Sequence, residues 1–236
     1  MFNKISSLVL AGLLFAVLTG SKNHISLLAL SLGVLVLATF VVNIKRIGLS
    51  WPHLLLPVLF LLGCGLIYMI IDSPTLRLLF LLASSVSFYL LESKLGKESH
   101  LLQNFYLFSV LSIFVGIFAL DFYLDLSTIW VVGLVFLASF LLSIQGFAGF
   151  SLPAKKFFYL MIAIVLSQAA WGLSVWPTHY VVDAVVLFCL FYLLWTFSFS
   201  AFFGKLTVKK IYLQVSLVVI VLILTLSTAA WRPLVH

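Results

Sequence analysis

Residues 180–202 read YVVDAVVLFCLFYLLWTFSFSAF, and Asp183 is the only charged side chain among them. A helix of about 20 apolar residues is long enough to cross the hydrocarbon core of a bilayer. The stretch is apolar on every side and lacks the strict polar–apolar alternation of a membrane β-strand. We therefore predict that residues 180–202 form a transmembrane helix.

Similar apolar runs recur along the whole chain. We predict nine spans, at residues 5–19, 25–43, 52–71, 75–92, 101–120, 127–147, 157–175, 180–202 and 211–230. The connections between them are too short for a soluble domain. Apolar residues make up 64% of the chain and charged residues 8%, whereas a soluble domain carries about 25% charged residues. The predicted fold is all-α, a polytopic bundle of transmembrane helices that forms a single integral membrane domain over residues 1–236.

Basic residues predict the orientation of this bundle, because they are retained on the cytoplasmic side of a membrane. With nine spans, one side receives ten of the 13 basic residues, namely Lys4, Lys45, Arg46, Lys94, Lys97, Lys155, Lys156, Lys205, Lys209 and Lys210. We therefore expect a multi-pass protein of a bacterial cytoplasmic membrane with its N-terminus in the cytoplasm. This distribution explains the net charge of +7 without a nucleic-acid partner. The expected partners are the lipid bilayer and other membrane protein subunits.

The first span has an alternative interpretation. It is short, begins after Lys4 and ends in Thr19-Gly20-Ser21, which also resembles a secretory signal peptide. We expect a retained helix, and cleavage would leave eight spans in the same orientation.

The two halves of the chain share a sequence pattern. Residues 48–52 read GLSWP before the third span, and residues 149–153 read GFSLP before the seventh. This pattern predicts a parallel tandem repeat of four helices, residues 25–120 and 127–230, preceded by one extra span. The alternative is that the motifs arose independently, since serine and proline favour the start of any helix.

The middle of the predicted spans lacks charged side chains. Every Asp, Glu, Lys and Arg can be placed in a loop or at a span boundary. Ion-driven carriers and intramembrane hydrolases usually hold charged groups near the bilayer midplane, where such groups are costly and functional. The sequence therefore disfavours a proton- or sodium-driven transporter.

The outer ends of the spans carry the polar constellation that we single out, which consists of Asp72, Asp121, Asp125, His179 and Asp183. Carboxylates and a histidine at one face can bind a cation, position a polar head group or act as acid and base. The alternative is structural. Asp72 and Asp125 are expected to cap helices, and Asp183 lies in a first turn, where the helix dipole favours an anion.

Gln168, Trp171 and Trp195 are candidates for lining a cavity inside the membrane. A tryptophan at mid-depth, such as Trp195, is away from its preferred interface and needs a hydrogen-bond partner for its indole N–H. Packing in the helix core is the alternative for all three side chains.

No motif in the sequence names a reaction. It contains no phosphate-binding glycine loop, HExxH, CxxC or GxSxG, and we expect no catalytic residue, metal or cofactor. Cys64 and Cys189 lie inside apolar runs and are expected to behave as buried hydrophobes. Our first hypothesis is a non-enzymatic subunit or scaffold of a membrane complex. The alternatives are a carrier or passive pathway for a lipid or small solute, and a membrane enzyme acting on a lipid-linked substrate at the outer face.

Overall fold

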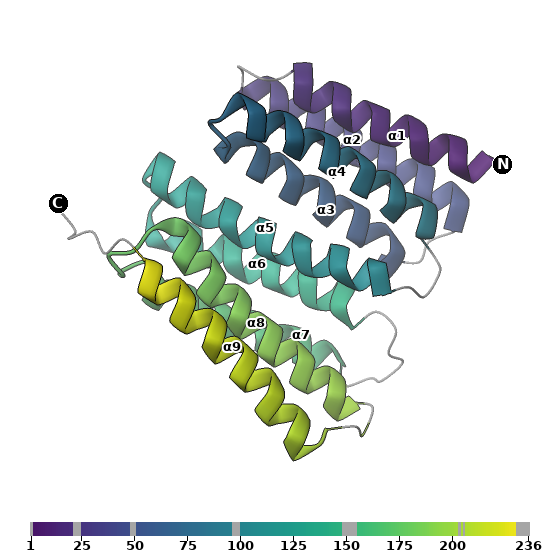
Figure 1. The fold of residues 1–236 in the computed structure, drawn as a ribbon. Helices are drawn as coiled ribbons and strands as arrows, with labels where there is room; N and C mark the ends of the chain where they lie inside the picture. The colour runs from purple at the N-terminus through teal and green to yellow at the C-terminus, as the bar shows by residue number, and fades with distance from the viewer. Residues whose placement is uncertain are drawn as a thin grey trace. The chain divides into compact units, whose positions relative to one another are not determined.

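The computed structural model describes residues 2–20, 25–47, 51–95, 100–147, 155–202, 204 and 206–229. Within these ranges the backbone forms nine α-helices and no strand. In order they are α1 Phe2–Gly20, α2 Ile25–Ile47, α3 Trp51–Ile70, α4 Pro74–Lys94, α5 His100–Leu124, α6 Thr128–Gly146, α7 Lys155–Leu173, α8 Tyr180–Phe202 and α9 Val208–Thr228 (Figure 1). Each helix coincides with one predicted span, so the all-helical fold is confirmed.

Most of the described helices have the length and composition of membrane spans. Seven of them, α2 and α4 to α9, contain stretches long and apolar enough to cross a bilayer. The described apolar parts of α1 and α3, Ile5–Gly20 and Leu54–Ile70, are shorter. The described part of the chain is therefore a polytopic bundle of apolar helices.

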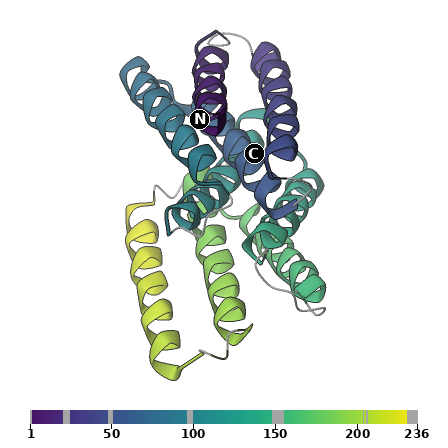
Figure 2. The same ribbon diagram turned by 90° about the vertical axis from the view of Figure 1, so that its right-hand side faces the viewer.

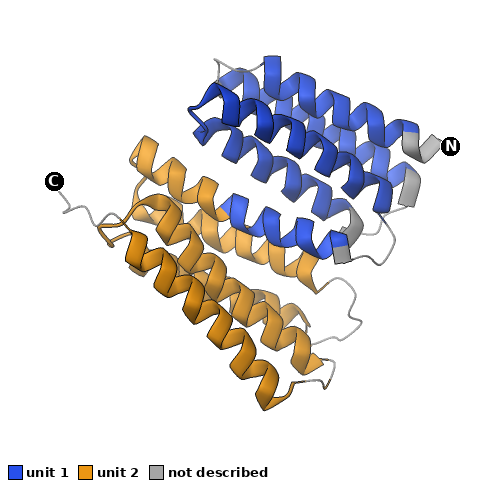
Figure 3. Ribbon diagram, in the orientation of Figure 1, with its two compact units in different colours: residues 1–113 blue, residues 114–236 orange. Residues whose placement is uncertain are grey.

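Two compact units divide the chain, residues 1–113 and residues 114–236 (Figure 3). The division falls inside α5, whose first half belongs to unit 1 and whose second half belongs to unit 2. The predicted repeats instead have their boundary between residues 120 and 127. Of the two shared motifs, residues 149–153 and residues 48–50 lie outside the described residues. The tandem repeat stays a prediction.

Unit 1 is built around the first four helices. Helix α1 packs against α2 and α4, and α3 packs against the same two helices, so the four enclose a common interior. Phe60 of α3 stacks on Phe88 of α4 with 6.0 Å between ring centroids. Helix α3 also approaches the first half of α5 closely, since a Cβ added at Gly63 would lie 2.8 Å from the Cβ of Ser112. Small side chains thus set the distance between these two helices.

Unit 2 contains an extensive helix pair and one peripheral helix. Helix α6 packs along α7, and the small side chains Ser139, Ser143 and Ala163 are fully buried there, as close helix contact in a membrane requires. Helix α8 packs against α7 and α9. Helix α9 lies beside α8 (Figure 2), and Val218 is its only buried residue.

Candidate functional site

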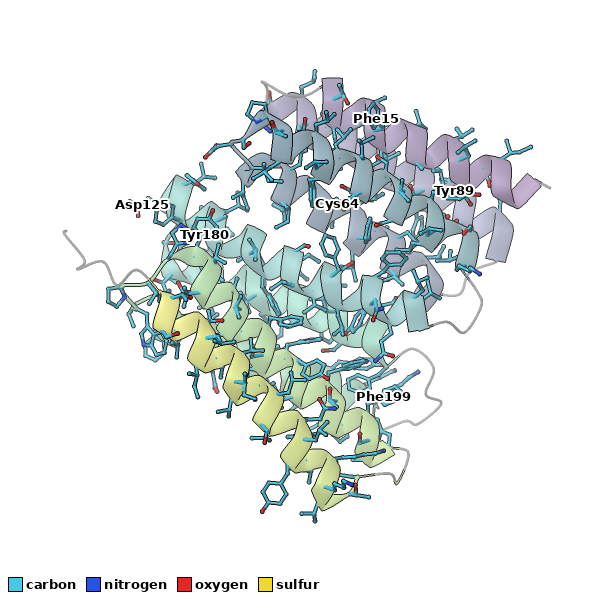
Figure 4. All side chains as sticks on the ribbon, viewed as in Figure 1. Phe15, Cys64, Tyr89, Asp125, Tyr180 and Phe199 are labelled. Carbon is cyan, nitrogen blue, oxygen red and sulfur yellow. The ribbon has the colours of Figure 1, made fainter. Side chains whose placement is uncertain are left out.

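Four of the five predicted outer-face residues belong to unit 2 and come from two of its helix ends. Asp121 lies in the last turn of α5, and Asp125 follows that helix directly. His179 precedes α8, and Asp183 lies in its first turn, as predicted. In Figure 4 the labelled Asp125 and Tyr180 lie at the same end of the unit. The structure therefore brings these four residues to one place.

The carboxylate of Asp183 organises the start of α8. Its side chain is only 6% exposed, and its Oδ1 accepts a hydrogen bond of 2.5 Å from the hydroxyl of Thr178. Sequence reasoning missed Thr178 as a partner. The carboxylate of Asp183 also interacts electrostatically with that of Asp121, which in turn interacts with that of Asp125. Three neighbouring carboxylates create a local negative potential that attracts cations.

Aromatic rings surround the same helix ends. The ring of Phe122 lies 5.6 Å from that of His179 and 5.4 Å from that of Tyr180, measured between centroids. Tyr123 contacts Tyr180 at 5.8 Å. Aromatic and polar groups mixed in this way are typical of the membrane–water interface. The packing ties the end of α5 to the start of α8 and explains the position of Asp121 near Asp183.

The prediction that Asp72 and Asp125 cap helices is wrong. The N-cap residues are Ser73 for α4 and Ser127 for α6. Asp125 instead has a φ of 49°, a left-handed conformation that aspartate tolerates because its short side chain can hydrogen-bond locally. Asp72 is an exposed residue of unit 1, between α3 and α4.

The three residues of the predicted cavity have different environments. Gln168 and Trp171 lie on the exposed face of α7, and Trp171 is 65% exposed. Trp195 is buried on α8, and its Nε1–H donates to the carbonyl oxygen of Gly146 over 3.1 Å. The indole partner expected for a mid-depth tryptophan is therefore the backbone at the end of α6. A cavity shared by all three stays a prediction.

Sequence reasoning missed a buried carboxylate in unit 1. Glu92, near the end of α4, is fully buried although its position predicted a span boundary. The amide nitrogen of Asn43, on α2, donates to its Oε1 over 2.8 Å, and Asn43 is also fully buried. A signal was present in the sequence, because Thr39 and Asn43 lie one helical turn apart and form a polar stripe on one face of α2.

The described residues contain no group of three or more His, Cys, Asp or Glu side chains that could hold a metal ion. Cys64 and Cys189 are free and buried, as predicted. An enzymatic role for the outer cluster stays a prediction. Unchanged function after replacement of Asp121, Asp125 and His179 by alanine would exclude it.

Comparison with known proteins identified no relative of the chain. No protein-family model, curated protein or solved structure matches the chain.

Proposed function

We propose that this chain works by binding, as a non-enzymatic subunit or scaffold of a larger membrane complex. One observation carries the proposal: every Asp, Glu, Lys and Arg in the described helices lies within the first or last four residues of its helix. The middle of each described helix therefore offers no carboxylate, lysine or arginine for driving an ion or cleaving a bond inside the bilayer. Binding to other membrane proteins requires no charged group in the middle of a helix.

The proposal includes a bacterial cytoplasmic membrane and an N-terminus in the cytoplasm. Lys45 and Lys94 lie at the ends of α2 and α4, whereas Lys155 and Lys209 lie at the starts of α7 and α9. If consecutive helices cross in alternating directions, all four lysines are on the same side as the start of α1. Enrichment of basic residues on the cytoplasmic side supports this orientation.

Native mass spectrometry tests the subunit proposal. The chain is crosslinked in its own membrane, extracted gently and weighed, with membranes that lack the chain as the control. We expect a stoichiometric protein partner that survives extraction. Recovery of the chain without any protein partner, with or without a retained lipid or solute, would contradict the proposal.

A second candidate, a carrier or passive pathway for a lipid or small solute, has support from hydrogen bonds that recur at the same spacing. The Asn43 side chain donates to the Glu92 carboxylate, and the Trp195 indole donates to the backbone carbonyl of Gly146. The donor and acceptor positions are exchanged, but each bond spans 49 residues of sequence. Positions 43 and 146 are 103 residues apart, and so are positions 92 and 195. This correspondence favours a tandem repeat, which is common in transporters. Passage of labelled lipids or solutes into proteoliposomes above the rate for empty liposomes tests it.

A further inference from the structure

A stripe of exposed side chains runs along α7 of unit 2. Its members recur three or four residues apart, so they share one face of the helix. They are Phe157, Leu160, Ile164, Gln168 and Trp171, and each is exposed. The other faces of α7 pack against α6 and α8. We call these residues the Gln168 stripe, after its one polar member.

The amide of Gln168 lies inside a helix that is long and apolar enough to cross a bilayer. Residue 168 is 13 residues after Lys155, where α7 begins, and five residues before Leu173, where it ends. At 1.5 Å per residue these separations are about 20 Å and about 7.5 Å along the axis. Long side chains on a helix point back toward its N-terminus, so this amide points away from the nearer end. It therefore faces hydrocarbon rather than water.

The side chain of Gln168 forms no hydrogen bond with any residue that the structure describes. Gln214 of α9 differs, because its Oε1 accepts a hydrogen bond of 2.7 Å from the hydroxyl of Tyr192 on α8. An unpaired amide in hydrocarbon is unfavourable. Glutamine in a membrane helix typically bonds to a neighbouring helix. Within the described part of one chain, Gln168 lacks that neighbour.

We infer that the Gln168 stripe is the contact surface between two copies of this chain. Two copies with the same topology place Gln168 at the same depth, and a twofold axis along the membrane normal brings their α7 helices together in parallel. A primary amide has two N–H donors and an oxygen acceptor, so each Gln168 donates to the other. The apolar members of the stripe pack above and below this pair.

A second copy fits the Gln168 stripe better than a lipid or a different protein does. An acyl chain has no donor or acceptor for the amide, and a different helix would need a polar side chain at the same depth. An identical helix meets both conditions. This contact is independent of the subunit proposal, and the mass of the bound molecule separates a second copy from any other protein.

Disulfide crosslinking in native membranes tests which molecule covers the stripe. Ile164→Cys places a thiol on the stripe, one turn from Gln168, whereas the native Cys64 and Cys189 are buried. With copper phenanthroline as the oxidant, we expect an adduct of twice the mass of the chain. Leu217→Cys is the control, because position 217 is exposed on α9 and, like position 164 on α7, lies nine residues after the start of its helix. It should give far less adduct.

Energy transfer between labelled chains in liposomes measures the strength of the contact. Gln168→Leu should raise the dissociation constant about eightfold, because two hydrogen bonds between helices are lost. Gln168→Asn keeps the amide and should bind more tightly than Gln168→Leu. Gln103→Leu is the matched control, because it removes an exposed amide from the first turn of α5, at a helix end, and should leave the dissociation constant unchanged.

Three results would overturn the inference. An Ile164→Cys adduct with a different protein, or no adduct at all, would mean that another helix, lipid or another part of the chain covers the stripe. Equal yields of dimer from Ile164→Cys and Leu217→Cys would indicate random collision. A dissociation constant that Gln168→Leu leaves unchanged would show that the amide takes no part in the contact.

Discussion

Replacing Asn43 by leucine is expected to lower the free energy of unfolding in detergent by about 3 kcal/mol. The substitution keeps the number and branching of the side-chain heavy atoms but removes the donor that contacts Oε1 of the fully buried Glu92. A buried carboxylate that loses a donor keeps its full desolvation penalty. Glu92 has further interactions, so the expected loss is smaller than for an isolated buried charge.

Denaturant titration followed by circular dichroism measures this loss. Gln168→Leu is the matched control, because it removes an amide from the exposed face of α7 and should change the unfolding free energy by no more than about 0.5 kcal/mol. If Asn43→Leu and the control have the same unfolding free energy, the hydrogen bond between Asn43 and Glu92 does not stabilise unit 1.

The second large effect is expected for Gly63→Ala, with a loss of about 1–3 kcal/mol in unfolding free energy. The new Cβ would lie 2.8 Å from the Cβ of Ser112, which is a rigid part of that side chain. Helices α3 and α5 would have to move apart and would lose van der Waals contacts. In lipid these contacts hold helices together, because there is no hydrophobic driving force between helices.

Gly133→Ala provides the control for Gly63→Ala. A Cβ at Gly133 of α6 would meet nothing within 4 Å. Alanine in a helix is more stable than glycine by about 1 kcal/mol of folding free energy. The two variants should therefore shift the thermal midpoint in opposite directions. Equal shifts would mean that α3 and α5 do not pack as closely as the structure shows.

The helices were predictable because length and composition alone specify a membrane span. The predicted span 180–202 matches α8, and 75–92 falls inside α4. The predicted ends are less accurate where apolar and polar residues mix. Helix α5 continues through Asp121 to Leu124, although the span was predicted to end at residue 120.

The sites were less predictable, because charge and position along the chain do not reveal which way a side chain faces. Glu92 and Asp72 were both assigned to span boundaries, yet Glu92 is fully buried and Asp72 is exposed. Proximity of Asp121 to Asp183 depends on the packing of aromatic rings between α5 and α8. Contacts between distant helices of this kind leave no pattern in a single sequence.

Accessibility of single introduced cysteines tests the central claim, a bundle that crosses the membrane with a cytoplasmic N-terminus. The native Cys64 and Cys189 are 0% and 3% exposed, so they should contribute little background labelling. Asp125 and Lys156 are both exposed and are proposed to lie on opposite sides. In intact cells, a membrane-impermeant maleimide should label Asp125→Cys at once and Lys156→Cys only after the membrane is permeabilised. Labelling of Lys156→Cys in intact cells, with or without Asp125→Cys, would contradict the proposed topology.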